Sequence, residues 1–324
     1  MEILLLTHDG LEQKTLDELP VLLAAENGGV LWMNMGDPSD EDARVMREVF
    51  HFHPLAIEDT HNHEQRPKIE EYPGYLFLIV NPVTMTPNQD DLDFRELDIF
   101  IGRNYVVTAH NEAHEPVIET TRQRLSRTGA LPQINASYVL YVLLDEVVDG
   151  YFPIMDMVEE EINSLEDLIL ERPRQESLAR VFTLKRMLLH LWRVVWPERD
   201  MLSTLSQPHV LAFADKNAAQ YYMRDVSDHL YRIADMVGTF RDTLTSVIDL
   251  YMSSVSNRLN RVVNRLTVIT LAFGFFAVIT GFYGMNFAHT WPPITSYWGV
   301  PFVLVLMALV TGVVIFVLRR IDDF

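Results

Sequence analysis

The stretch LTVITLAFGFFAVITGFY, residues 266–283, followed by GMNF and by a second apolar run at residues 298–318, decides the architecture of this chain. No Asp, Glu, Lys or Arg occurs between Leu266 and Leu318. Each run is close to the roughly 20 residues that a helix needs to cross a bilayer. We therefore predict two transmembrane helices. A long apolar hairpin in a soluble core is the alternative, but soluble cores seldom contain so long a stretch without charge.

Arginines flank the two apolar runs but are absent from the loop between them. Arg258, Arg261 and Arg265 precede the first run, and Arg319 and Arg320 follow the second. By the positive-inside rule both termini are predicted to be cytoplasmic, in a cell membrane, with the GMN loop on the outer face. The start of the chain, MEILLLTHDG, has no basic region before its apolar residues and is not typical of a signal peptide.

Small and polar residues follow one face of the first run. They recur mostly three or four positions apart: Asn260, Asn264, Thr267, Thr270, Gly274, Ala277 and Gly281. Such a stripe suits close helix packing in lipid and equally suits the wall of a pore. Two helices per chain cannot enclose a water-filled path, so a pore requires several copies with the first run on the inside.

The residues after the first run can end a helix and attract cations. Gly284 is expected to take the left-handed conformation of a helix C-cap, which leaves the last carbonyl groups facing outward with the negative end of the helix dipole. Asn286 adds an amide oxygen beyond them. An ordinary loop with C-cap chemistry is the alternative for a single G-x-N sequence.

Composition separates an acidic part from the apolar C-terminal part. The 324 residues include 45 acidic and 26 basic side chains, a net charge of −19, and no cysteine. An acidic surface repels nucleic acid and favours cations, and the lack of cysteine excludes disulfides and thiolate metal sites. We therefore expect no nucleic-acid partner.

A long helix is predicted to lead into the first apolar run. From Val226 to Leu266 apolar residues alternate steps of four and three, which is heptad spacing, so a helix should run from about residue 218 into the membrane. Residues 136–206 form a second, acidic helical region, with Pro153 a kink and Pro173 a break. Its carboxylates can be a solvated face or can attract cations.

The first 130 residues mix strand-like and helical patterns, which indicates an α/β domain. The strands are expected within residues 29–35, 75–85 and 97–110, and the helices at 38–51 and 112–128. The segment HFHPLAIEDTHNH holds His51, His53, His61 and His63, which could chelate zinc. Loop and turn histidines are the alternative that we favour, because no carboxylate or thiol spacing completes a known pattern.

Several of these segments resemble the CorA-type divalent metal transporters. The resemblance rests on YGMNF (283–287) between two spans, HPLAIEDTHNHEQRPKIEEY (53–72), LDIFIGRNYVVTAH (97–110), YVLLDEVVDGYF (141–152) and DLYMSSVSNRLNRVVNRLTVIT (249–270). It covers roughly residues 45–320 and leaves the first forty unplaced. The outer loop lacks the acidic residues often found in the family, so cation capture there would rest on helix ends, Asn286 and His289.

The resemblance implies a fold and a set of sites. The fold is an α+β cytoplasmic domain followed by long helices and two C-terminal transmembrane helices, assembled as a funnel-shaped homopentamer. Gly284, Met285 and Asn286 would form the outer selectivity ring, and Asn260 would lie on the pore axis. Asp59, with Glu58 beside it, would face Asp225 of the next subunit across a regulatory divalent-cation site. Relatives can carry a bulky apolar gate residue at the position of Gly274 and a hydroxyl residue at the position of Ala277. The narrowest ring of the expected pore is therefore not assigned.

The expected division of the chain follows from these patterns. We expect an α/β domain at 1–130, an acidic helical region at 131–217, a stalk helix continuing into the first span at 218–283, an outer loop at 284–297, the second span at 298–318 and a tail at 319–324. The expected function is membrane-potential-driven influx of Mg²⁺ through the lipid bilayer, gated by intracellular Mg²⁺, without enzymatic catalysis. The alternatives are transport of Zn²⁺, Co²⁺ or Ni²⁺ by the same fold, and a membrane-tethered sensor or scaffold that does not conduct.

Overall fold

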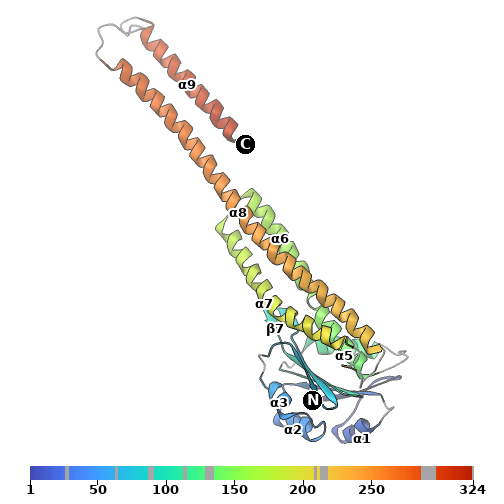
Figure 1. The fold of residues 1–324 in the computed structure, drawn as a ribbon. Coiled ribbons are helices and arrows are strands. Elements are labelled where there is room, and N and C mark those ends of the chain that lie inside the picture. The colour runs from blue at the N-terminus through green and yellow to red at the C-terminus, as the bar shows by residue number, and fades with distance from the viewer. Residues whose placement is uncertain are drawn as a thin grey trace. The chain divides into compact units, whose positions relative to one another are not determined.

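The computed structural model describes most of the chain and divides it into two compact units (Figure 1). The described residues are 1–25, 29–62, 65–86, 91–111, 115–127, 135–207, 210–211, 218–285 and 297–322. The first unit comprises residues 1–165 and 178–246, and the second comprises 166–177 and 247–324. The first unit therefore holds both the expected α/β domain and most of the acidic helical region.

A seven-stranded sheet forms the centre of the first unit. Its strand order is β2-β1-β3-β9-β8-β5-β4, in which β3 and β9 are parallel and the other neighbours are antiparallel. The strands are β1 (Glu2–Thr7), β2 (Gly10–Gln13), β3 (Val30–Gly36), β4 (Lys68–Tyr72), β5 (Tyr75–Val80), β8 (Leu97–Ile101) and β9 (Tyr105–His110). A separate hairpin pairs β6 (Val83–Met85) with β7 (Leu92–Phe94).

Successive residues of each strand point to opposite faces of the sheet, and both faces carry apolar side chains. On β3, Leu31, Met33 and Met35 join the core on one face together with Met46 and Phe52 from the helical segments. That face carries η1 (Leu16–Glu18), α1 (Leu19–Ala24), α2 (Asp40–Glu48) and α3 (Pro54–Asp59), of which α1 to α3 can be followed in Figure 1. The expected strands and both expected helices are confirmed. β1, β2, η1 and α1 lie before the expected strand at 29–35, in a segment to which the sequence patterns assigned no element.

The other elements of the chain are helices. α4 (Pro116–Arg127) and α5 (Ala136–Asp149) pack against each other, and α5 contacts β3, β8 and β9. The long helices are α6 (Phe152–Glu171), α7 (Gln175–Leu205), α8 (Ala218–Tyr283) and α9 (Gly299–Asp322). The predicted start of the stalk helix at about residue 218 and the break at Pro173 are confirmed.

The predicted kink at Pro153 is wrong, because the helix ends before that residue. α5 stops at Asp149, and α6 begins at Phe152. Pro153 therefore lies in the first turn of a new helix, where the missing N–H donor costs no hydrogen bond.

A buried carboxyl group joins α7 to the end of β5. Glu198 is 2 % exposed, its Oε1 accepts a hydrogen bond from the Asn81 N–H at 2.8 Å, and its Oε2 lies 2.8 Å from the Tyr151 hydroxyl. That hydroxyl also lies 2.9 Å from the Asn81 carbonyl oxygen. One hydroxyl proton can serve only one of these acceptors, so a proton on Glu198 Oε2 completes the network. Burial accordingly raises the pKa of Glu198 to about 7.

This raised pKa predicts how stability changes with pH. Glu198 binds its proton more tightly in the folded chain than in the unfolded chain. Its contribution to the free energy of unfolding is therefore complete below the ordinary pKa of 4.5 and is lost as the pH rises through the folded-state pKa of about 7. Glu198→Gln mimics the protonated form at every pH. It should therefore lack the loss of stability, on the order of 2 kcal/mol, that the parent shows as the pH rises. Relative to the parent, the variant should gain stability between pH 5 and pH 8 in thermal unfolding of the full chain in detergent.

The exposed Glu176→Gln on the same helix is the matched control. A Glu198→Gln variant whose stability relative to the parent is the same at both pH values would contradict the protonated network.

Candidate functional site

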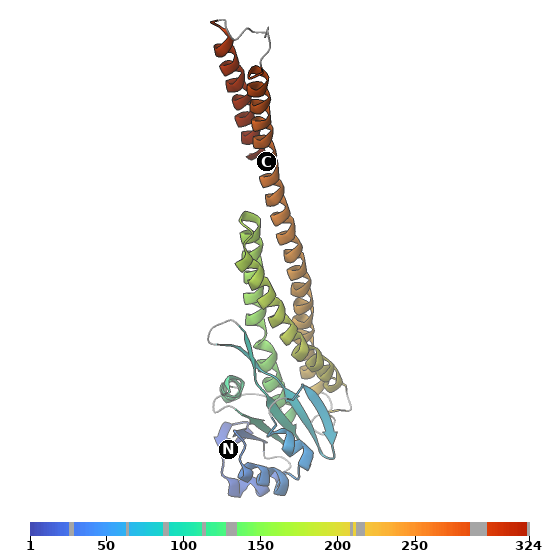
Figure 2. The same cartoon turned by 90° about the vertical axis from the view of Figure 1, so that its left-hand side faces the viewer.

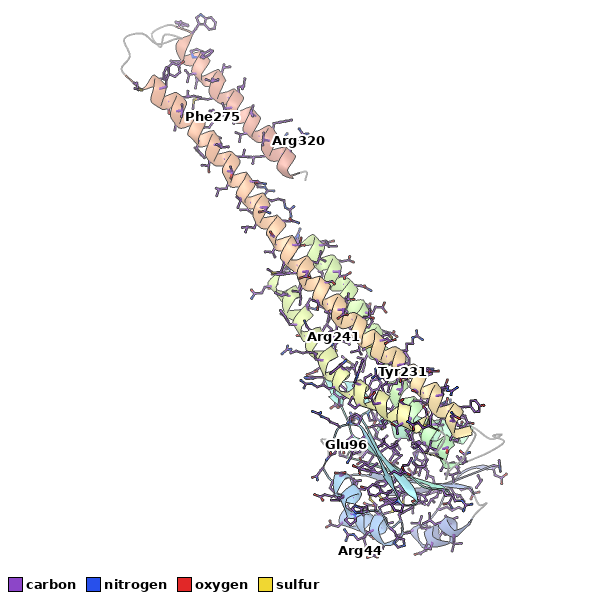
Figure 3. All side chains as sticks on the ribbon, viewed as in Figure 1. Arg44, Glu96, Tyr231, Arg241, Phe275 and Arg320 are labelled. Atoms are coloured by element: carbon purple, nitrogen blue, oxygen red, sulfur yellow. The ribbon has the colours of Figure 1, made fainter. Side chains whose placement is uncertain are left out.

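The apolar parts of α8 and α9 are almost entirely uncovered by the rest of the chain. Two helices, Ala219–Tyr283 and Gly299–Arg320, are long and apolar enough to cross a membrane, and only 6 % and 0 % of their most apolar windows are buried. Phe275 on α8, for example, is 58 % exposed and stands free of the ribbon in Figure 3. A core hairpin of a soluble protein would bury these residues, so the exposure favours two membrane spans over that alternative.

The predicted stripe of α8 is exposed along its whole length. All seven members, from Asn260 to Gly281, are exposed. A side chain at Gly274 or Gly281 would meet no atom within 4 Å among the described residues. A glycine inside a helix costs about 1 kcal/mol relative to alanine, and no described contact of this chain explains these two.

A second face of α8 is less exposed. Its members are Val268, Ala272, Phe276, Ile279 and Tyr283, again three or four residues apart. At 100° per residue this face lies roughly opposite the stripe from Thr267 to Gly281. Within the second unit α9 runs alongside this part of α8 in both views (Figures 1 and 2). The stripe is thus left free on the far side of the pair.

Asn260 and Asn264 lie at the other end of the stripe, where α8 and α9 leave a groove between them. The groove has a volume of about 740 Å³, and its lining also includes Arg261, Phe316 and Arg320. The two asparagines therefore line a groove within one chain, and the predicted place of Asn260 on a pore axis is not tested by this.

The end of α8 differs from the predicted C-cap. Gly284 does not adopt the left-handed conformation, because its N–H continues the helix by bonding the Thr280 carbonyl at 2.9 Å. The Met285 N–H then bonds the Phe282 carbonyl at 3.3 Å, which tightens the last turn. Glycine still suits the position, since a Cβ there would lie 3.1 Å from the Thr280 oxygen. Met285 is exposed, and Asn286 and His289 lie outside the described residues.

Asp59 lies at the end of α3, in a pocket lined by charged residues of β4. Its Oδ2 accepts a hydrogen bond from Lys68 Nζ at 2.7 Å, and its Oδ1 accepts one from Gln65 Nε2 at 3.4 Å. The Asp59 side chain is 20 % exposed, whereas the neighbouring Glu58 is fully at the surface. This carboxylate is thus partly exposed at the pocket and is already paired with Lys68.

Asp225 lies on α8 and has a different partner. Its Oδ2 accepts a hydrogen bond from the Tyr141 hydroxyl at 3.2 Å, and the residue is exposed. Among the described contacts, Asp59 and Asp225 share no partner within one chain. The predicted pairing, which joins two subunits, is consistent with this but is not tested by it.

The histidines of residues 51–63 have local structural roles where they are described. His53 Nδ1 accepts the Leu55 N–H at 3.2 Å and so caps α3, and its ring stacks on Tyr72. His61 Nδ1 lies 3.0 Å from the Ile57 carbonyl oxygen. His51 is exposed, and His63 lies outside the described residues. Among the described residues, none of the three belongs to a group that could hold a metal ion.

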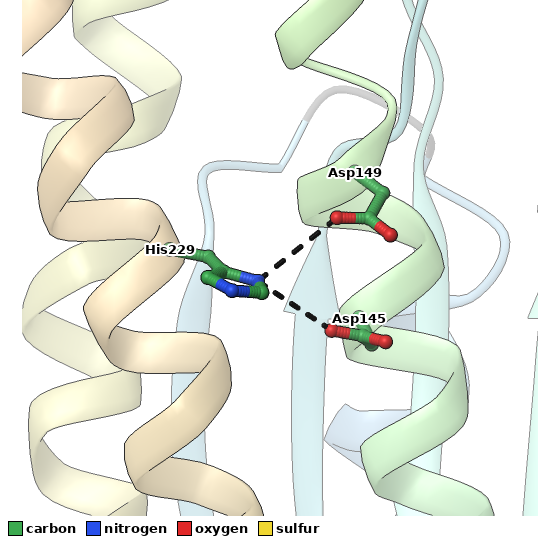
Figure 4. Close-up of side chains that lie close together, drawn as sticks. All are labelled: Asp145, Asp149 and His229. Atoms are coloured by element: carbon green, nitrogen blue, oxygen red, sulfur yellow. Dashed lines mark ion pairs between the residues drawn. The ribbon is translucent and has the colours of Figure 1, made fainter.

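A different histidine joins two carboxylates in a group that could hold a cation (Figure 4). Asp145 Oδ1 and Asp149 Oδ1 of α5 lie 3.8 and 4.0 Å from His229 Nδ1 of α8. Asp145 is 5 % exposed and its Oδ2 is held by Arg124 at 2.7 Å. Burial, and then the charge of Asp145, raise the pKa of Asp149. The spacing of the two aspartates placed them on one helix face, but no sequence signal indicated that His229 would lie opposite.

Comparison with known proteins places the chain in a family. The family model described as "CorA-like Mg2+ transporter protein" matches residues 27–320. The cobalt/magnesium transport protein CorA of Thermotoga maritima is 34 % identical over 311 residues, which cover 95 % of this chain and 88 % of that protein. The protein of the same name from Methanocaldococcus jannaschii is 23 % identical over 98 % of each chain.

A solved structure agrees with the fold. The complete structure of the CorA magnesium transporter from M. jannaschii has a TM-score of 0.74, is 20 % identical, and covers 98 % of this chain and 97 % of its own. The α/β domain, the long helix and the two C-terminal apolar helices are therefore a shared arrangement. On the match to 27–320 and the identity to the Thermotoga protein, this chain belongs to the family of CorA-like Mg²⁺ transporters.

Proposed function

We propose that this chain assembles as a homopentamer and carries divalent cations, with Mg²⁺ as the main ion, across a cell membrane. The observation that carries the proposal is the combination of family membership with two apolar helices that the chain itself leaves exposed. Both termini are assigned to the cytoplasm by the flanking arginines. The inward direction of transport is assigned to the membrane potential, which is negative inside. Catalysis has no part in the process.

Assembly of several copies is supported by the heptad positions of α8. They are buried from Val226 to Val247, apart from the half-buried Phe240, whereas Leu259, Val262 and Leu266 are 61, 54 and 63 % exposed. An apolar seam that continues without a partner in its own chain is typical of a helix that packs against copies of itself. Such packing brings the stripes of neighbouring α8 helices together around one axis.

The stripe supplies a suitable wall for a hydrated ion. Its hydroxyls, amides and glycines carry no full charge, so a dication is not held as tightly as carboxylates would hold it. Mg²⁺ gives up its water ligands reluctantly and is readily bound through them. We assign Gly284, Met285 and Asn286 to the outer ring, where the amide oxygen of Asn286 accepts hydrogen bonds from the water of the entering ion.

The membrane potential is a sufficient driving force. Moving one charge across 100 mV releases about 2.3 kcal/mol, so a dication gains roughly 4.6 kcal/mol. The sequence contains no Walker motif, and the proposal requires no nucleotide. Co²⁺ is a second candidate ion, since the Thermotoga relative is named a cobalt/magnesium transport protein. Zn²⁺ and Ni²⁺ transport and a non-conducting sensor are the competing outcomes of a flux measurement.

Regulation by internal Mg²⁺ is assigned to Asp59, Glu58 and Asp225. Carboxylates that meet across a subunit boundary repel each other, and a bound dication reverses the sign of that interaction. The accessibility of Asp59 and Asp225 in the single chain supports this, because both can take a ligand from outside it. High internal Mg²⁺ would then hold the subunits together and the pore closed.

Replacing Asn286 by Leu should abolish uptake while leaving assembly intact, because the variant lacks the amide oxygen that meets the hydrated ion. We expect the Mg²⁺ flux into proteoliposomes to fall at least tenfold. A tenfold change corresponds to the loss of an interaction of about 1.4 kcal/mol. Asn163→Leu, an exposed position on α6, is the matched control. Parent-like flux through a correctly assembled Asn286→Leu protein would remove Asn286 from the ion path.

Removing both regulatory carboxylates should uncouple closure from internal Mg²⁺. Asp59→Ala with Asp225→Ala should conduct at internal Mg²⁺ levels that silence the parent, and should lose Mg²⁺-dependent protection from proteolysis. Internal Mg²⁺ shifts the equilibrium between the open and the closed channel only through its different affinity for these two states. At low internal Mg²⁺ the site is empty in the parent as well, so the flux of the variant should equal that of the parent.

The control pair for this variant is Asp9→Ala with Asp242→Ala, two exposed acids. Closure of the Asp59/Asp225 variant at the same internal Mg²⁺ as the parent would place the sensor elsewhere.

A further inference from the structure

Lys68 lines the acidic pocket that contains Asp59. Its Nζ lies 2.7 Å from Asp59 Oδ2 and 2.8 Å from Glu70 Oε1. The pocket has a volume of about 560 Å³ and is also lined by Leu55, Glu71 and Tyr72. In this chain the carboxylate of Asp59 is therefore already neutralised by a tethered ammonium group.

The fold fixes this ammonium group in place. Lys68 and Glu70 are two residues apart on β4, so both side chains leave the same face of the sheet. Tyr72, two residues further, donates its hydroxyl to Glu70 Oε2 at 2.8 Å and holds that carboxylate toward Lys68. The Lys68 ammonium also lies 5.6 Å from the centre of the Phe77 ring. The side chain is only 29 % exposed, so its position is defined by neighbours on several sides.

The ammonium group and a dication compete for the same oxygen atoms. Lys Nζ is a compact point charge with three donors and no acceptor, so it binds carboxylates much as a metal ion does. A lysine side chain is charged at neutral pH. A dication that binds Asp59 must therefore displace this ammonium group from the carboxylate or share the carboxylate with it.

We propose that Lys68 is a built-in competitor that sets the internal Mg²⁺ concentration at which the Asp59 site is filled. The inference rests on the proposed regulatory role of Asp59 and extends it to a residue outside the set of ligands. With Lys68 present, a dication gains the Asp59 carboxylate only at the expense of an existing ion pair. The threshold for closure is thereby moved to a higher Mg²⁺ concentration than the carboxylates alone would give.

The test is a Mg²⁺ titration of protease protection in the full chain, assembled in detergent. Lys68→Met keeps the length of the stem and removes the charge, and it should lower the Mg²⁺ midpoint roughly twofold to fivefold, the range expected for loss of a partly exposed ion pair. Lys68→Arg keeps the charge and should leave the midpoint at or above that of the parent. Lys14→Met removes a lysine that pairs with Glu12 on the other edge of the same sheet, and it should behave as the parent.

Lys68→Gln is titrated in parallel, with the same expected shift, so that a folding defect of one neutral variant does not decide the result. A midpoint that is unchanged or raised in the folded neutral variant would overturn the competitor role. The variant Asp59→Ala distinguishes a failure of the proposed regulatory site from a failure of the inference on Lys68. If protection persists at the parent midpoint in Asp59→Ala, the proposed regulatory site fails. If Asp59→Ala abolishes protection while the neutral Lys68 variants titrate as the parent, only the inference on Lys68 fails.

Discussion

The exposed apolar surface of α8 and α9 is the constraint on which the rest of the structure depends. Between Leu266 and Leu318 the chain has no charged side chain, and the described contacts cover almost none of this surface. In water such a surface would be strongly unfavourable, at about 25 cal/mol for each Å² of apolar area. Lipid can cover the Phe275 side of α8, but the polar and glycine-rich stripe is a poor match for hydrocarbon. The stripe therefore calls for an aqueous or protein neighbour, and in the proposed assembly copies of the same helix would provide both.

Acidic and basic residues are distributed unevenly along the chain. No acidic residue occurs from 250 to 321, whereas Arg258, Arg261, Arg265, Arg319 and Arg320 all lie in that stretch. The acidic residues are concentrated in the first unit, where many are neutralised locally: Asp145 by Arg124, Glu161 by Arg180, and Asp59 by Lys68. A large net negative charge can thus coexist with defined folding, because the buried carboxylates have partners or, as at Glu198, retain a proton.

Periodicity made the long elements predictable. Heptad spacing located the start of α8, the absence of charge located both apolar helices, and alternation located β3, β5, β8 and β9. Features that depend on contacts between distant segments were not predictable. β1 and the edge strand β2 come from a short run without clear alternation. β1 is defined by its pairing with β3, and β2 by its pairing with β1. His229 reaches Asp145 only because α5 and α8 are brought together, and the conformation of Gly284 follows from a hydrogen bond to Thr280 that no composition rule specifies. The roles of Asn286 and of the Asp59–Asp225 pair came from the family resemblance, and they remain predictions.

The most direct test of the central claim is Mg²⁺ uptake into sealed liposomes that contain only this protein and no nucleotide, with an inside-negative potential imposed by a K⁺ gradient. The account predicts uptake that rises with the imposed potential, is absent from protein-free liposomes, and is carried by particles whose mass corresponds to five chains. Correctly inserted protein that gives no Mg²⁺ flux at any potential, or a monomer that transports at the full rate, would contradict it.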